Sequence, residues 1–194
     1  MSSAVSCRLQ MAVAEGTEGS PASIFAIAAE LNSRGFLDAN DLMIVGADES
    51  IGNGFEKWEI LKTAGPVSQW SRDAKARRNE LISDMVGEDG ARAMAEILSS
   101  KGNDRLGDLD VGLAAWTRID PVGASNWYQE NRATLDKEES DQVAKTFSSE
   151  SVRSLEFDGA RRWAAEIKDQ GLQAGILKHI DEKFAEAANA RTSP

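Results

Sequence analysis

A short pattern recurs along this chain at an almost constant spacing, and this recurrence constrains the fold more than any other feature. Asp89-Gly90-Ala91-Arg92 reappears as Asp158-Gly159-Ala160-Arg161, each followed by a large apolar residue three places after its alanine. Weaker copies give five starts, at residues 21, 54, 90, 123 and 159, separated by 33 or 36 residues. A fixed period of about 20 to 50 residues is typical of repeat proteins. The spacing therefore predicts a repeat architecture.

Each copy has the features of one helix with marked ends. Ser20-Pro21 and Asp120-Pro121 place an N-cap side chain before a proline in the first helical turn. A glycine is expected just beyond a helix C-terminus, and one follows four of the copies, at Gly35, Gly65, Gly102 and Gly171. The fourth copy lacks this glycine, and its helix is expected to fray from Asn131 toward Leu135.

Apolar residues at three- and four-residue spacing predict a second helix in the gap of each unit. Such stripes run through residues 66–86, 109–116 and 143–151, and a terminal helix is predicted over 173–187. The segment 37–46 fits either a buried strand or a short helix, and its context favours a helix.

Composition agrees with a helical chain. The 28 alanines outnumber the valines, isoleucines and threonines taken together, and β-branched residues favour strands. We therefore predict an all-α fold, an α-solenoid of about five antiparallel helix pairs with a terminal helix. Residues 1–188 form one helical-repeat domain in this prediction, and residues 189–194 form a loose tail.

The repeat resembles tetratricopeptide-like and other helical-hairpin repeats, although the Leu-Gly-Tyr set of the tetratricopeptide pattern is absent. A closer resemblance is to bacterial repeats written Ala-Trp, Asp-Pro, Ala-x-x-Trp. Ala115-Trp116, Asp120-Pro121 and Ala124-x-x-Trp127 match this pattern, and residues 158–163 match it in part. The resemblance implies a helical-repeat fold and transfers no catalytic residue.

Few residue types suited to catalysis or metal binding are present. The single Cys7 excludes an internal disulfide, and the single His179 excludes paired-histidine metal sites. Asp104, Asp108 and Asp110 lack the alternating ligands and the bidentate glutamate of an EF-hand. We predict no catalytic residue, no cofactor and no metal.

The net charge of −10 bears on the partners. An acidic surface repels phosphate backbones and anionic lipid, so direct binding to nucleic acid or a membrane is not expected. The chain shows neither a signal-peptide pattern nor an apolar run of membrane-spanning length, which favours a cytoplasmic location. The oligomeric state stays open.

One dense basic segment stands out in this acidic chain. Trp70 is followed by Arg77 on nearly the same helical face, with Arg78 about 80° away. Tryptophan and arginine are enriched at interface hot spots, so Trp70, Arg77 and Arg78 form a candidate protein-binding site for an acidic peptide. In the alternative interpretation, Trp70 packs into the next helix pair and the arginines pair with acids such as Glu80 and Asp84.

The sequence thus favours a non-catalytic scaffold that holds a protein or peptide on the concave face of a solenoid. An acidic inhibitor or decoy of a nucleic-acid-binding enzyme is the alternative. An enzyme with a carboxylate-based site is a third, less favoured, hypothesis.

Overall fold

The computed structural model describes residues 53–62, 70–100 and 104–192, together with Ile27, Glu30, Leu31, Arg34, Gly35, Leu37 and Asp41. Within these residues all regular secondary structure is helical and no strand occurs, which confirms the predicted all-α class. The repeat start at residue 21 and Cys7 lie outside the described residues. So does most of the segment 37–46, whose two alternatives stay open.

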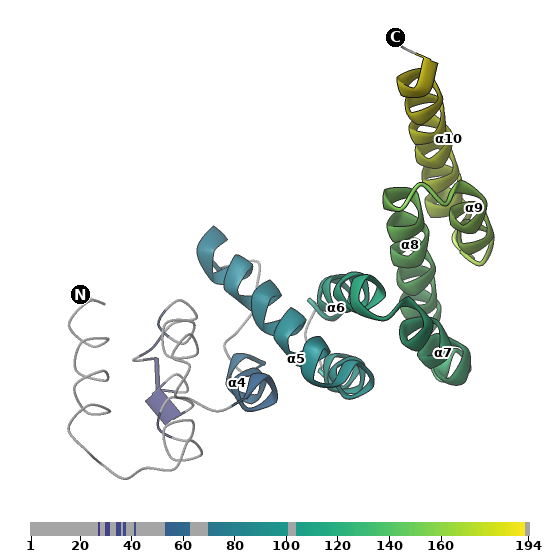
Figure 1. Ribbon diagram of the computed structural model, residues 1–194. Coiled ribbons are helices and arrows are strands. Elements are labelled where there is room, and N and C mark those ends of the chain that lie inside the picture. The colour runs from purple at the N-terminus through teal and green to yellow at the C-terminus, as the bar shows by residue number, and fades with distance from the viewer. Residues whose placement is uncertain are drawn as a thin grey trace.

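Seven described helices follow one another along an elongated, bent path (Figure 1). Each packs on near neighbours in the chain: α4 on α5, α5 on α6, α6 on α7 and α8, α8 on α9, and α9 on α10. Their bounds are α4 Gly54–Leu61, α5 Arg72–Ser99, α6 Arg105–Ile119, α7 Pro121–Asn131, α8 Lys137–Arg153, α9 Phe157–Ala165 and α10 Gln170–Thr192.

Four helix starts recur close to the predicted positions. Helix α4 begins at Gly54, and α5 is interrupted at Asp89, whose extended backbone (φ −159°, ψ 98°) starts a new helical segment at residue 90. The Asp89 carboxylate caps this segment by accepting the Arg92 N–H at 3.0 Å. Helices α7 and α9 begin two residues before the predicted starts at 123 and 159. The two Asp-Gly-Ala-Arg copies therefore occupy different positions in their helices.

The bounds of two predicted segments differ from those in the structure. Helix α5 begins only at Arg72, because the Ser71 side chain accepts the Ala74 N–H at 3.1 Å and forms the N-cap there. Trp70 consequently lies before the described helix rather than inside it. The tail expected to be loose from residue 189 is helical as far as Thr192. Gly171 lies in the first turn of α10 rather than just beyond the end of α9.

The predicted apolar stripes contribute buried residues to the described core. Leu109, Leu113 and Trp116 of α6 are buried, as are Val143 and Phe147 of α8. Tyr128, Phe147 and Trp163 form an aromatic cluster that joins α7, α8 and α9, with ring centroids 4.5 to 6.2 Å apart. Trp163 is only partly buried, whereas Trp58 and Trp127 are buried. On α10, only Ile180 of the predicted stripe is buried.

Candidate functional site

The three residues predicted to bind a partner have different surroundings. Trp70 and Arg78 are each only 6% exposed, whereas Arg77 is exposed. Because Trp70 precedes α5, it does not share a helical face with Arg77. A buried side chain offers little area to a partner, so Arg77 is the only one of the three at the surface.

Arg78 makes its main contacts inside the protein. Its Nε and Nη2 donate to the two carboxylate oxygens of Asp108 in the first turn of α6, at 2.8 and 2.6 Å. Its guanidinium also lies over the rings of Trp58 and Trp70, at 4.7 and 5.1 Å from their centroids. This arrangement joins α4, α5 and α6 around one buried cation. The alternative partners Glu80 and Asp84 are not used: Arg78 pairs with an acid 30 residues away.

The electrostatics of this pair indicate a structural role. Burial raises the pKa of the Asp108 carboxyl, and the hydrogen bonds and charge of Arg78 offset only part of that rise. The Nε1 atoms of Trp58 and Trp70 are buried without a hydrogen-bond partner among the described residues. Since both charges are buried and paired with each other, the pair is an internal contact between α5 and α6 and does not face a ligand.

A second carboxylate links α6 to α8. Glu150 accepts hydrogen bonds from Arg118 Nη2 at 2.5 Å and from Arg153 Nε at 2.6 Å. Burial raises the pKa of Glu150, but the hydrogen bonds from the two arginines outweigh that effect and lower its pKa overall. The charged form of Glu150 therefore stabilises the fold.

This lowered pKa predicts a stability change in acid. The contribution of Glu150 is complete above the ordinary glutamate pKa of about 4.3 and is lost as the pH falls through the lower, folded-state value. Urea unfolding of the wild type and of Glu150→Gln at a series of pH values tests this. The stability advantage of the wild type should shrink below about pH 4.3. An advantage that stays constant down to about pH 3 would contradict the assignment.

The acidic residues near the start of α6 are engaged by different helices. Asp108 pairs with Arg78 of α5, whereas Asp110 accepts hydrogen bonds from Gln142 and Thr146 of α8 at 2.7 and 2.5 Å. Within the described residues, no group of three or more potential ligands could hold a metal ion. His179 lies exposed on α10.

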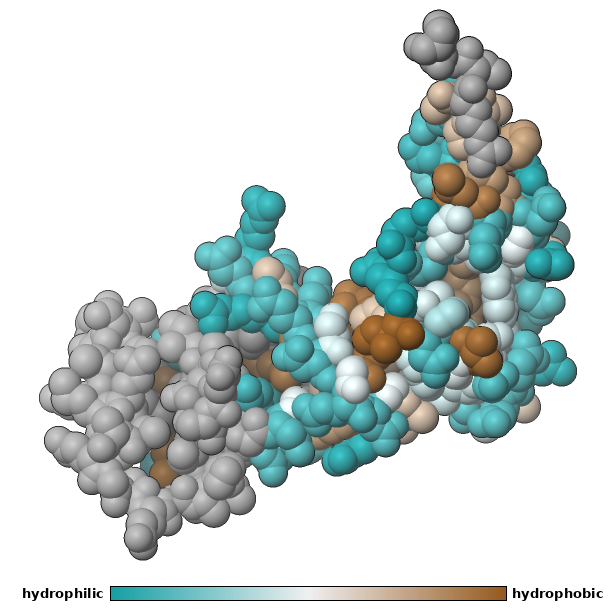
Figure 2. All heavy atoms as spheres, viewed as in Figure 1, coloured by the Kyte–Doolittle hydropathy of each residue, from teal (hydrophilic) through white to brown (hydrophobic). Residues whose placement is uncertain are grey.

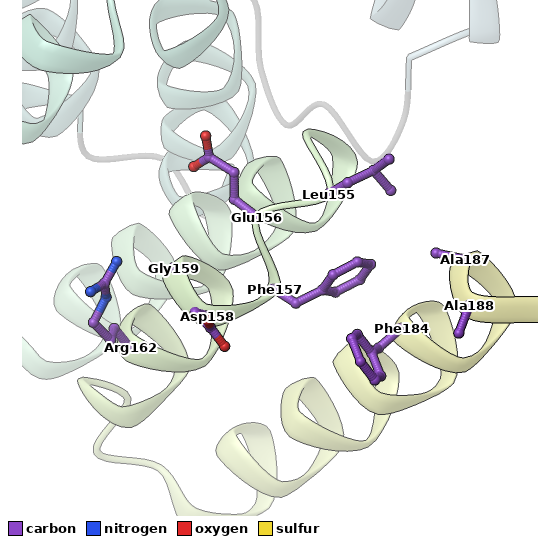
Figure 3. A pocket seen from close by; sticks show the side chains of 9 residues that line it. All are labelled: Leu155, Glu156, Phe157, Asp158, Gly159, Arg162, Phe184, Ala187 and Ala188. Atoms are coloured by element: carbon purple, nitrogen blue, oxygen red, sulfur yellow. The ribbon is translucent and has the colours of Figure 1, made fainter. Parts of the chain in front are cut away.

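The described part of the chain also contains an open groove of about 820 Å³, lined by both apolar and polar groups, between the start of α9 and the C-terminal half of α10. Figure 3 shows Phe157 and Phe184 pointing toward each other, with Leu155 extending toward Ala187 on the same side. In the space-filling view, apolar atoms are visible where α8 leads into α9 beside α10 (Figure 2). Glu156, Asp158 and Arg162 contribute polar groups to the lining.

The sequence interpretation placed Phe184 and Ala187 in a terminal helix but did not identify this groove. One signal was present: Leu155 follows α8 at the position where a glycine is usual after a helix. The groove itself depends on how α9 and α10 are placed relative to each other, and the spacing of residues in the sequence does not predict that placement.

No described helix is long and apolar enough to cross a lipid bilayer. No family model, curated protein or solved structure matches the chain. The function is therefore argued from the residues alone.

Proposed function

We propose that this chain is a non-catalytic helical-repeat scaffold that binds a protein or peptide. The observation that carries the proposal is the groove beside α10, in which the large apolar side chains of Leu155 and Phe184 are 56% and 49% exposed. Large apolar side chains grouped at an exposed concave surface are typical of sites for protein partners.

The recurrent helix starts support the repeat interpretation. Helices or helical segments begin at residues 54, 90, 121 and 157, and a further helical segment follows each of them. In this proposal the helix pairs stack as a solenoid of antiparallel pairs, in which each pair covers the apolar face of the one before. Helix α10 is the last described helix, and Phe184 of its apolar stripe is exposed while Ile176 and Ala187 are partly buried.

Capture followed by reconstitution tests this function. We expect the purified chain to retain a specific protein from an extract of the source organism, and the purified pair to form a complex with a measurable Kd. The matched control is the same chain unfolded by heat. Failure of every captured protein to bind in purified form would contradict the scaffold function.

A further inference from the structure

We propose that the groove between α9 and the C-terminal half of α10 receives an amphipathic segment of a partner protein, with apolar anchors and lysine or arginine residues beside them. This inference rests on the proposed scaffold function and adds the site and the chemistry of the partner. Three observations carry it: a strained exposed leucine, an aromatic pair of which one ring is half exposed, and carboxylates in the groove lining.

Leu155 occupies a backbone position that favours glycine. The Glu156 N–H donates to the Ser151 carbonyl at 2.8 Å, and the Leu155 N–H donates to the Val152 carbonyl at 2.9 Å. These two bonds form the Schellman motif, whose C′ residue adopts a left-handed conformation. Leu155 has φ +61°, the only positive φ of a non-glycine residue in the described part of the chain.

This leucine is unfavourable for the free protein in two ways. A side chain in the left-handed region is strained, and 56% of Leu155 is exposed, so burial does not repay that strain. A glycine at this position would remove both the backbone strain and the exposed apolar side chain. A partner that covers Leu155 supplies the missing burial, because removing apolar area from water stabilises a complex.

Phe184 forms the opposite wall of the groove. Its ring lies edge-on to Phe157, with centroids 5.3 Å apart, and the Arg161 guanidinium lies 5.4 Å from its centroid. Half of Phe184 remains exposed while Phe157 is buried. The aromatic pair therefore offers an apolar surface of defined shape to a side chain of a partner.

The charges at the rim favour a basic partner. Glu156 and Asp158 are exposed lining residues of the groove. Asp158 lies 3.6 Å from Arg161, which pairs more closely with Asp181, at 3.0 Å. Figure 3 shows that Arg162 and the Glu156 carboxylate both extend away from the two phenylalanine rings. The net charge of −10 adds a long-range attraction for cations. Lysine or arginine next to the apolar anchors would pair with the rim carboxylates.

A pair of synthetic peptides tests this chemistry. The probe is an amphipathic peptide of about 14 residues, roughly four helical turns, made of leucine and lysine, and its analogue has glutamate in place of lysine. Fluorescence anisotropy should show that the lysine peptide binds at least about tenfold more tightly than the glutamate peptide. Tighter binding of the glutamate peptide would overturn the proposed chemistry.

Substitutions in the chain test the site. Leu155→Gly and Phe184→Ser should each weaken binding of the lysine peptide about tenfold. Val122→Ser is the matched control, since Val122 is 67% exposed on α7 and does not line the groove, and it should leave the affinity unchanged. Leu155→Gly should also raise Tm by about 2 to 4 °C through relief of strain. Loss of binding therefore cannot be attributed to unfolding.

A second comparison separates specific pairing from general attraction. Glu156→Gln with Asp158→Asn should weaken binding more than Glu80→Gln with Asp84→Asn, which removes the same charge from α5. Equal effects of the two double variants, or equal binding by Phe184→Ser and Val122→Ser, would overturn the groove as the site.

The remaining outcomes also decide between occupants. Sedimentation velocity of the chain alone shows whether it forms a dimer. If it does, and if Phe184→Ser breaks that dimer, the occupant of the groove is a second copy of the chain, and the proposal of a basic partner segment is overturned. If a reconstituted partner binds Phe184→Ser as well as the wild type, the scaffold function stands and the groove is wrong. If no protein forms a complex at all, the scaffold function itself fails.

Discussion

Replacing Asp108 by alanine is expected to lower the free energy of unfolding by about 3 to 5 kcal/mol. The substitution leaves the Arg78 guanidinium buried between two tryptophan rings without its carboxylate partner. An uncompensated buried charge is costly, because the protein interior solvates it far less than water does. Urea unfolding followed by circular dichroism measures the change.

The double variant Arg78→Met with Asp108→Leu is the informative control. It removes both buried charges and keeps apolar volume, so it should recover most of the stability that Asp108→Ala loses. This expectation follows from the raised pKa of Asp108, which shows that Arg78 does not fully offset the burial of the carboxylate. Glu186→Ala breaks the exposed pair with Lys183 and should cost less than about 1 kcal/mol. A double variant no more stable than Asp108→Ala would show that the ion pair itself stabilises the fold.

The sequence predicted helix existence better than it predicted the site. Helix starts depend on local residues, so Asp120 was identified as a cap from the proline that follows it. Asp89 was predicted only to begin a repeated tetrapeptide, and the structure shows that it is a cap as well. Trp70 shows the limit of such signals. The helix over 66–86 was predicted from its apolar spacing, whereas the described helix starts at the Ser71 cap. The three-residue site prediction depended on that single helix.

The ion pair and the groove depend on contacts between distant segments. Arg78 has acids nearby at Glu80 and Asp84, yet it pairs with Asp108, which α5–α6 packing brings to it. No local pattern distinguishes these acids. The groove likewise arises from the packing of α9 against α10. Leu155 alone carried a readable signal, since a leucine stands where a glycine is usual.

The glycines of the repeated tetrapeptide provide the second prediction. A Cβ atom added at Gly90 would lie 2.6 Å from Cδ2 of Trp116 and closer still to Cε2. Trp116 is buried and packs against Trp127, with ring centroids 6.1 Å apart, so it has little room to move. Gly90→Ala is therefore expected to destabilise the protein by about 1 to 3 kcal/mol.

Gly87→Ala, one turn earlier in α5, should stabilise the protein, whereas Gly90→Ala should destabilise it. A Cβ atom there meets no other atom within 4 Å, so alanine should gain about 0.5 to 1 kcal/mol through its better helix propensity. Gly159, the counterpart of Gly90 in the second copy, would place its Cβ atom 3.6 Å from Ser151 Oγ, an ordinary contact. Gly159→Ala should therefore behave like Gly87→Ala in thermal unfolding. If Gly90→Ala is instead as stable as the other two variants, Trp116 can yield, and the close approach of α5 to α6 does not require a glycine.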